Sequence, residues 1–357
     1  MQEKKITVGV LGTGLAGQIH TRALQQIPGV RVKGASASSM QSASLFQSQF
    51  NLEVAYANWE QLLADDEITV VHNCLPNTLH LPVSKAAIEC GKHVLSDKPL
   101  GISSQETQIL LDMVCASNAI DGLSMNYRGL PMIQKAKTLI DGGALGDLLY
   151  VRGRYLQSYN LAPLKQAWKS DGSMIGSSYV TADLGYHWLD LLLYLTGEEV
   201  AQLQASFASL GHCPPNVENF STVSLQTQTG ATVQAMFSKI SAGYQNGLMI
   251  EMAGSKGLLR WDQTKQEELV YQSAQGDIHT YLRGVGDNEA PDVQALPPQH
   301  HGGWVDGFVN VFDKYYAAVR EGKPGKGYPT FADGHRINQI VDAMIESAKS
   351  HKNIVLG

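Results

Sequence analysis

Cysteine, positive charge and long apolar runs are all scarce in this chain of 357 residues. Cys74, Cys90, Cys115 and Cys213 are too few and too scattered for a disulfide framework or a cysteine-based zinc site. No apolar run approaches the roughly 20 residues that cross a bilayer as a helix, and the start of the chain lacks the apolar segment of a secretory signal. We therefore expect a cytoplasmic protein with reduced thiols, no metal and no membrane partner.

The balance of charges argues against a nucleic-acid partner. Lysine and arginine number 27 against 33 aspartates and glutamates, a net charge of −6, whereas phosphate binding needs a basic stripe. Charged residues make up only 17% of the chain, below the roughly 25% of ordinary globular proteins. A surface with so little charge indicates that part of it is covered, and we expect a homodimer or homotetramer.

Residues 1–125 alternate strand patterns with helix patterns, which predicts a parallel sheet with helices on both faces. Strands are predicted at residues 6–11, 30–36, 54–57, 68–75, 93–96 and 120–124. Helices are predicted at residues 15–27, 40–50, 59–64, 81–90 and 103–118.

From about residue 126 the pattern changes to runs in which apolar and polar side chains alternate. Such runs, joined by glycine-containing turns, predict a largely antiparallel sheet with one wetter face. The other face of this sheet is a candidate contact with a second subunit. A long loop is predicted at 284–303, and helices at 304–321 and 333–351. The alternating runs lie at residues 200–210, 222–226, 233–237, 248–252 and 258–261.

A glycine motif stands between the first predicted strand and the first predicted helix, which is the context that a dinucleotide-binding fingerprint requires. The first glycine permits a tight turn, the second lets backbone approach a pyrophosphate, and the third lets helix and strand pack closely. The N-terminus of the helix supplies N–H groups and the positive end of its dipole. A plain glycine-rich turn is the alternative. The six cofactor-binding residues predicted here are Gly12, Thr13, Gly14, Leu15, Ala16 and Gly17.

The fold class that follows is α/β. A Rossmann doubly wound parallel sheet is expected over residues 1–125, and an α+β domain for substrate binding and oligomerisation, with a largely antiparallel open sheet, over residues 126–357.

The identity of the dinucleotide depends on the residue about 20 positions after the glycine motif. An acid there holds the ribose 2′-hydroxyl and repels a 2′-phosphate, but this chain has Ala37, Ser38 and Ser39. No arginine or lysine follows the strand to pair with a phosphate, although the two serines offer hydroxyl and N–H groups. NADP is therefore favoured over NAD, and neither is excluded.

Two further predicted strands end in loops at the edge of the sheet where ligands bind. After the first strand, Asn77 is placed to bond the nicotinamide ribose, and His80 is either a cofactor contact or a packing residue. After the second strand come Asp97 and Lys98, and a partly desolvated lysine beside a nicotinamide would exchange protons near neutral pH. An ordinary surface lysine is the alternative. The first loop adds Cys74, Leu75 and Pro76 to the predicted cofactor-binding residues.

Residues 181–195 are predicted to form a helix that is apolar on most of its surface and therefore buried. Asp183 and His187 lie four residues apart on one face, and Asp190 and Tyr194 continue that polar stripe. Because an unpaired buried charge is costly, the stripe faces either a substrate pocket or partners inside the core.

Taken together, these motifs resemble the Gfo/Idh/MocA oxidoreductases, the family of glucose–fructose oxidoreductase and inositol dehydrogenase. The similarity spans nearly the whole chain, although Asp97-Lys98-Pro99 stands where the family usually has Glu-Lys-Pro, so the ribose contact of the shorter acid is expected to shift. The C-terminal segment 328–336, with 261–262 and 300–303, is similar to a sugar-oxidising branch that includes levoglucosan-type dehydrogenases.

The resemblance implies hydride transfer between a hydroxyl carbon of a sugar or cyclic polyol and a nicotinamide, with Lys98, Asp183 and His187 as the catalytic residues. His187 would take the hydroxyl proton, Asp183 would orient the imidazole, and Lys98 would stabilise the alkoxide. Whether Lys98 or His187 is the formal base stays open. The resemblance also adds Arg128 to the cofactor-binding residues. The candidate sugar contacts are Lys98, Tyr127, Gln157, Trp168, Asp183 and His187, of which Tyr127, Gln157 and Trp168 are equally compatible with ordinary structure.

Two other functions remain as alternatives. One is an NAD-dependent glycosidase with a tightly bound cofactor, and the other is a non-catalytic sugar sensor that binds the dinucleotide as a ligand. Arg152 and Arg154 would allow an acidic sugar if they pointed inward, whereas exposure or pairing between subunits is the other interpretation.

Overall fold

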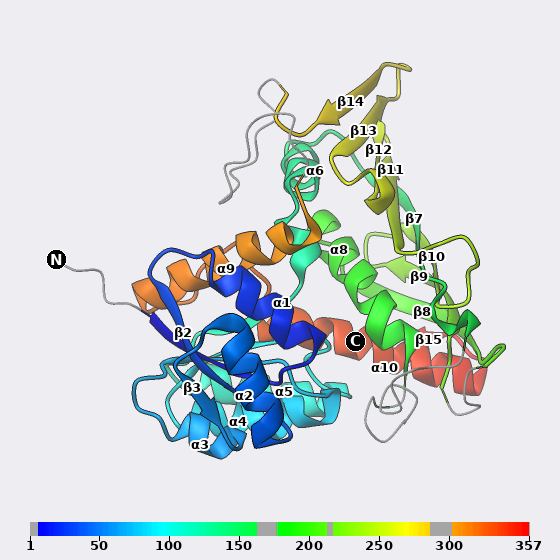
Figure 1. Ribbon diagram of the computed structural model, residues 1–357. Coiled ribbons are helices and arrows are strands. Elements are labelled where there is room, and N and C mark those ends of the chain that lie inside the picture. The colour runs from blue at the N-terminus through cyan, green and yellow to red at the C-terminus, as the bar shows by residue number, and fades with distance from the viewer. Residues whose placement is uncertain (1–5, 163–175, 177, 213–216, 286–301, 357) are drawn as a thin grey trace. The chain divides into compact units, whose positions relative to one another are not determined.

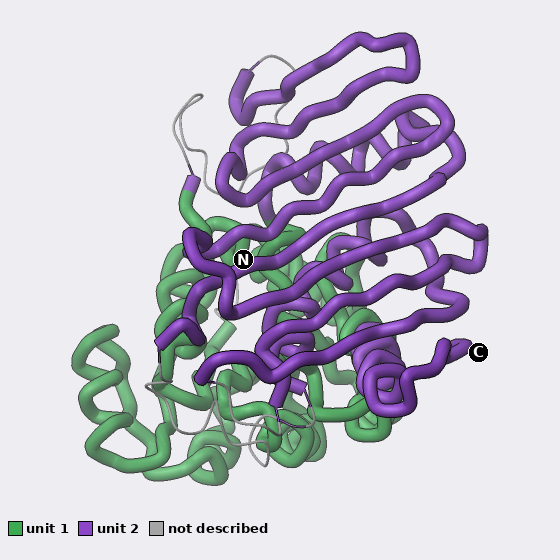
Figure 2. The backbone as a smooth tube through the Cα atoms, turned by 90° about the vertical axis from the view of Figure 1, so that its right-hand side faces the viewer, with its two compact units in different colours: residues 1–129, 303–336 green, residues 130–302, 337–357 purple. Residues whose placement is uncertain are grey.

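The computed structural model describes residues 6–162, 176, 178–212, 217–285 and 302–356. The chain forms two compact units: residues 1–129 with 303–336 (unit 1), and residues 130–302 with 337–357 (unit 2), coloured separately in Figure 2. Among the residues described, no helix is both long enough and apolar enough to span a membrane.

Unit 1 contains a six-stranded sheet in the order β3-β2-β1-β4-β5-β6, with every neighbouring pair parallel. The strand order reverses between β1 and β4, which confirms the predicted doubly wound sheet. The strands are β1 (Ile6–Leu11), β2 (Val30–Ser36), β3 (Val54–Tyr56), β4 (Val70–Asn73), β5 (His93–Ser96) and β6 (Asp121–Leu123). The first helices are α1 (Leu15–Leu24), α2 (Met40–Phe50), α3 (Trp59–Leu63), α4 (His80–Glu89) and α5 (Ser104–Cys115), drawn in blue to cyan in Figure 1.

Helix α9 (Trp304–Glu321) also belongs to unit 1, although it is distant in sequence. Its Phe308, Phe312 and Tyr316 join the core formed by β1, β4 and α1. Gly122 on β6 makes room for Tyr315, because a Cβ atom there would lie 2.7 Å from the Tyr315 ring. The expected domains, 1–125 and 126–357, therefore divide the chain differently from these units, because aromatic residues near the C-terminus complete the core of the first unit.

Unit 2 contains a nine-stranded sheet in the order β14-β13-β12-β11-β7-β10-β9-β8-β15. Only the β7–β10 pair is parallel among the described strand pairs of this sheet, so the prediction of a largely antiparallel sheet is confirmed. The strands are β7 (Leu148–Leu156), β8 (Val200–Ala208), β9 (Phe220–Thr227), β10 (Thr232–Ser238), β11 (Gly247–Gly254), β12 (Gly257–Asp262), β13 (Glu268–Ser273), β14 (Ile278–Leu282) and β15 (Ile354–Val355). Helix α6 (Pro131–Asp141) lies in unit 2, and α10 (Phe331–Ser350) begins in unit 1 and ends in unit 2.

Helix α8 (Tyr186–Thr196) packs tightly on the sheet of unit 2. The Trp188 indole N–H donates to the Met249 carbonyl at 3.0 Å, and a Cβ atom at Gly153 on β7 would lie 2.1 Å from that indole nitrogen. Glycine is therefore required at this point of close approach. The predicted helix over 181–195 is confirmed with one difference, since Thr181–Gly185 forms a π-helical turn that carries Asp183.

Candidate active site

The ends of β1, β2, β4 and β5 lie together at one edge of the sheet in unit 1, because Leu11 pairs with Ser36 and Asn73, and Asn73 pairs with Ser96. The glycine loop follows β1 at this edge. A Cβ atom on Gly17 would lie 1.9 Å from the Gly12 carbonyl oxygen, whereas a Cβ atom on Gly14 would meet no atom within 4 Å. Gly17 is thus required by packing, and Gly14 leaves open space before the N-terminus of α1. These residues fit the pyrophosphate of a dinucleotide.

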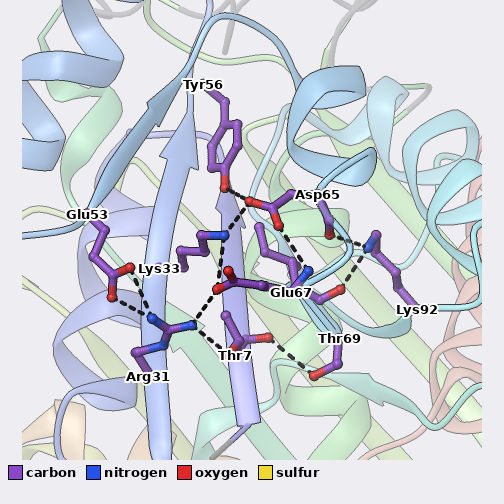
Figure 3. Close-up of polar contacts among 10 residues, drawn as sticks. Thr7, Arg31, Lys33, Glu53, Tyr56, Asp65, Glu67, Thr69 and Lys92 are labelled. Atoms are coloured by element: carbon purple, nitrogen blue, oxygen red, sulfur yellow. Dashed lines mark hydrogen bonds and ion pairs between the residues drawn. The ribbon is translucent and has the colours of Figure 1, made fainter.

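The loop after β2 offers hydroxyl and N–H groups but no charge. Ser39 caps α2, because its Oγ accepts from the Ser42 N–H at 3.2 Å, and the first turn of α2 holds no acid. Ala37 is half-buried and Ser38 is exposed. The cations earlier in β2 are already engaged: Arg31 pairs with Glu53 and Glu67, and Lys33 with Asp65 (Figure 3).

His80 joins the loops that follow β4 and β5. Its ring nitrogens lie 2.6 Å from the Pro99 carbonyl oxygen and 2.8 Å from the Leu75 carbonyl oxygen, and its side chain is buried. These contacts match the packing interpretation of His80, since both ring nitrogens face the protein backbone. Asp97 and Lys98 are half-buried on the loop that His80 supports. The loop after β4 is also partly buried. Its Leu75, Pro76 and Asn77 are half-buried, and Cys74 is buried.

The segment after β6 is more deeply buried than its predicted roles suggest. The Arg128 guanidinium donates to Asp333 at 3.0 Å. Burial opposes ionisation of Asp333, but the charge of Arg128 outweighs it and lowers the pKa of this carboxyl. Tyr127 is 1% exposed. Asn126, which the sequence analysis did not single out, is 0% exposed, and neither atom of its amide has a hydrogen-bond partner within the described part of the chain.

In unit 2, the carboxylate of Glu218 fixes the turn that carries Asp183. It accepts from the Tyr179 N–H at 2.9 Å, the Thr181 N–H at 3.0 Å and the Ser178 hydroxyl at 2.6 Å. Buried carboxylates need such donors to offset desolvation. Glu218 is therefore a supporting residue that periodicity in the sequence does not reveal.

Lys239, directly after β10, is the charged partner of Asp183. Its Nζ lies 2.5 Å from Asp183 Oδ2 and 3.8 Å from the centre of the Tyr179 ring. The Lys239 side chain is 3% exposed, while that of Asp183 is 38% exposed. His187 is buried on the following turn, with its ring 6.2 Å from that of Tyr155. Sequence reasoning missed Lys239, although a lysine directly after an alternating apolar strand was a usable signal.

Two buried amides lie close to Lys239 along the backbone. The Gln157 N–H donates to the Ser238 carbonyl at 2.7 Å, and the Asn160 N–H donates to the Lys239 carbonyl at 2.8 Å. Gln157 Nε2 donates to Asn246 at 2.7 Å, but its Oε1 has no hydrogen-bond partner in the described residues. Within the same residues, neither amide atom of Asn160 has a partner, although the side chain is 1% exposed. Trp168 lies outside the described residues.

Arg152 is exposed, as one interpretation expected, whereas Arg154 is half-buried with its guanidinium over the Tyr244 ring. Their side chains are 62% and 34% exposed, and they pair with Glu251 and Asp262 on the neighbouring strands.

The fold and the glycine loop define a dinucleotide-binding α/β protein with a second, sheet-based unit. Two family models match the chain, an oxidoreductase family with an NAD-binding Rossmann fold over residues 6–126 and a GFO/IDH/MocA C-terminal domain over residues 133–260. The chain belongs to the Gfo/Idh/MocA oxidoreductases, as the resemblance implied.

Two named relatives match nearly the whole chain. Levoglucosan dehydrogenase of Pseudarthrobacter phenanthrenivorans is 28% identical over 97% of this chain and 96% of its own length. Glucose-6-phosphate 3-dehydrogenase of Bacillus subtilis is 24% identical over 95% of each chain. A solved structure of levoglucosan dehydrogenase with NADH and levoglucosan has a TM-score of 0.92 at 25% identity, covering 99% of each chain. This chain is an NAD(P)-dependent oxidoreductase, and the glycosidase and sensor alternatives are not favoured.

Proposed function

We propose that this oxidoreductase oxidises a hydroxyl carbon of a neutral sugar or cyclic polyol. The observation that carries the proposal is the pair of buried amides, Gln157 and Asn160, which have side-chain atoms without a partner in the described residues and whose backbones bond to Ser238 and Lys239. A buried amide without a partner costs about 1–3 kcal/mol. A ligand with several hydroxyl groups would satisfy these atoms, because each hydroxyl both donates and accepts.

We assign the chemistry to Lys98, Asp183 and His187. A bound nicotinamide supplies the hydride acceptor. Lys98 donates a hydrogen bond to the reacting oxygen and stabilises the developing alkoxide, and either Lys98 or His187 takes the hydroxyl proton. Asp183 orients His187, while Lys239 and Glu218 hold Asp183 and its turn in place.

We infer that NADP is accepted at least as well as NAD. The absence of an acid after β2 removes the group that repels a 2′-phosphate, and the hydroxyl and N–H groups of Ser38, Ser39 and the α2 N-terminus are suitable donors. Arg31 and Lys33 are unsuited to this task, because carboxylates already hold them.

The decisive experiment is an absorbance assay of reduced nicotinamide formation with anhydrosugars, hexoses, cyclic polyols and sugar acids, each with NAD and with NADP. We expect turnover with a neutral sugar or cyclic polyol, and comparable or higher kcat/KM with NADP. Turnover confined to sugar acids would contradict the substrate class, and a strong preference for NAD would contradict the cofactor assignment.

We also propose a homodimer or homotetramer formed through the sheet of unit 2. The support is one face of β7, on which Tyr150 is 41% exposed beside the exposed Arg152. Figure 2 shows the sheet to which they belong in purple. Light scattering at low concentration is expected to give a multiple of the chain mass, and the mass of a single chain would refute the proposal.

A further inference from the structure

A cluster of buried titratable side chains in unit 1 has no role in the chemistry assigned above. His20 on α1 and His72 on β4 are both 0% exposed, and their Nδ1 atoms lie 3.0 Å apart. His72 Nε2 lies 2.8 Å from the hydroxyl of Tyr316 on α9. At the other end, His20 Nε2 lies 3.0 Å from Ser124 Oγ and 3.8 Å from Asp97 Oδ1.

Both imidazoles are neutral at pH 7. Burial lowers the pKa of His20 to about 4, although the charge of Asp97 acts in the opposite direction. Burial and the neighbouring His20 lower the pKa of His72 well below its usual value. Each ring therefore carries one N–H, and the contact between the two Nδ1 atoms contains one proton.

The proton count allows two arrangements, in which all hydrogen bonds run in one direction or in the other. In the first, Tyr316 donates to His72, His72 Nδ1–H donates to His20, and His20 Nε2–H points towards Ser124 and Asp97. In the second, Ser124 donates to His20, and the lone pair of His20 Nε2 faces the Asp97 carboxylate. The first arrangement is favoured because it places an N–H opposite the carboxylate.

We propose that Tyr316, His72 and His20 form a directional hydrogen-bond relay that ends at Ser124 and turns an N–H dipole towards Asp97, 3.8 Å away. The relay thereby positions Asp97, and with it the Lys98 loop, for the nicotinamide half of the cofactor. This inference rests on the cofactor-binding part of the proposed function. His20 reaches the residues that follow three strands, since it contacts Cys74 Sγ at 3.2 Å in addition to Asp97 and Ser124.

Helix α1 links the relay to the phosphate end of the predicted cofactor site. The N-terminus of α1 follows the glycine loop, which fits the pyrophosphate, and His20 lies one turn beyond Gly17. One helix thus connects the phosphate site to the loops that hold Asp97 and Lys98. The relay residues are positioning residues, because they lie beneath these loops and act through Asp97 and Ser124.

Binding of NADH and of ADP-ribose, which lacks the nicotinamide, separates positioning from general damage to the fold. We expect His20→Leu to weaken NADH binding about fivefold more than ADP-ribose binding, the equivalent of one hydrogen bond. Tyr316→Phe, which keeps the ring and removes only the first donor, is expected to act in the same direction with a smaller effect. Equal changes for both ligands, or no change for NADH, in the variant that folds would overturn the proposal.

His93→Gln is the matched control, because His93 is a histidine of the same sheet that lies at the start of β5. Its Nδ1 accepts from the Ile120 N–H at 3.0 Å, at the opposite end of β5 from Asp97. The ratio of NADH to ADP-ribose affinity is expected to be unchanged in this variant. A ratio altered as much as in His20→Leu would mean that any histidine of the sheet has the effect, which would also overturn the proposal.

Nitrogen-15 NMR of the wild-type protein, labelled at histidine, tests the direction of the relay. We expect the Nδ1–H tautomer for His72 and the Nε2–H tautomer for His20, both neutral at pH 7. The opposite tautomers, or an imidazolium at either position, would refute it. None of these measurements requires turnover, so a failure of sugar oxidation and a failure of the relay give different results.

Discussion

The two ends of the strands in unit 1 accommodate polar groups in opposite ways. At the amino end, Arg31 and Lys33 bind Glu53, Asp65 and Glu67 in a partly exposed network of ion pairs (Figure 3). At the carboxyl end, buried neutral histidines and glycine backbone take the place of charges.

The difference follows from access to water. Exposed ion pairs keep much of their hydration, so they cost little and contribute little, typically at most about 1 kcal/mol each. Buried groups cannot keep a charge cheaply and therefore bond as neutral donors and acceptors. Because the carboxyl end holds few fixed charges beyond Asp97 and Lys98, these two groups and the charges of a bound cofactor dominate its electrostatics.

The largest expected effect contrasts the same substitution at the two ends. Lys98→Met removes the donor to the reacting oxygen and is expected to lower kcat by about 10³-fold, while NADH binding is largely retained. Lys33→Met breaks ion pairs at the amino end only, so we expect an unchanged kcat and an effect confined to stability. Steady-state kinetics and chemical denaturation check both. Similar kcat values for the two variants would contradict the claim that only the carboxyl end of the strands takes part in the chemistry.

The next largest effect is a loss of stability at low pH that comes from the buried histidines His20 and His72. The folded protein binds a proton at His20 with a pKa of about 4, against 6.5 for an ordinary histidine. The unfolded chain therefore takes up this proton first, and the stability that is fully present above pH 6.5 is lost as the pH falls towards 4. For His20 the loss amounts to about 3 kcal/mol, and His72 adds to it in the same direction.

Urea denaturation between pH 7 and pH 4 measures this slope in the wild type and in His20→Gln, where it is expected to be shallower. Asp65→Asn is the control from the other end of the sheet. Burial opposes ionisation of Asp65, but Lys33 and Tyr56 outweigh it and lower its pKa to about 2, so its contribution is lost only below the ordinary value of 3.8. An identical slope above pH 4 in the wild type and His20→Gln would contradict the assignment.

The smallest effect is expected at the Asp183–Lys239 ion pair of unit 2, which we compare with the ion pairs at the amino end of the unit 1 strands. Unlike Lys33, Lys239 holds a carboxylate to which we assign a catalytic role. Lys239→Met is expected to lower kcat about tenfold by misplacing Asp183, with a changed pH profile and an unchanged KM for the cofactor. Lys239→Arg should restore most of the loss. A change in stability without any change in kcat would show that the pair is merely structural.

The sequence predicted the elements of unit 1 well because each has its own local signal. Strands such as β1 are apolar runs that end at glycine, and α2 begins at a serine cap, so both are recognisable without tertiary contacts. Two of the elements that were missed, β14 and β15, lack such signals. Strand β14 is exposed along most of its length, so it shows no buried face, and β15 has two residues whose only described strand partner is β8.

The residues of the candidate site also fall into those with a local sequence signal and those that depend on tertiary contacts. The glycine loop, Lys98, Asp183 and His187 carry recognisable spacing and could be proposed from the sequence. Glu218 has no such signal, and Lys239 has only its place directly after an alternating strand. Their partners Thr181 and Asp183 are 37 and 56 residues away in the chain, so their pairing could not be predicted. The relay of His20 and His72 depends similarly on tertiary contacts with Tyr316.

The central claim is direct hydride transfer from a sugar carbon to the nicotinamide. The most direct measurement is a single turnover with a substrate that carries deuterium on the carbon to be oxidised, followed by mass spectrometry of the reduced cofactor. We predict one deuterium atom per molecule of reduced cofactor, with none exchanged for hydrogen from water. Reduced cofactor without the label, or substrate consumed with no reduced cofactor formed, would contradict the account.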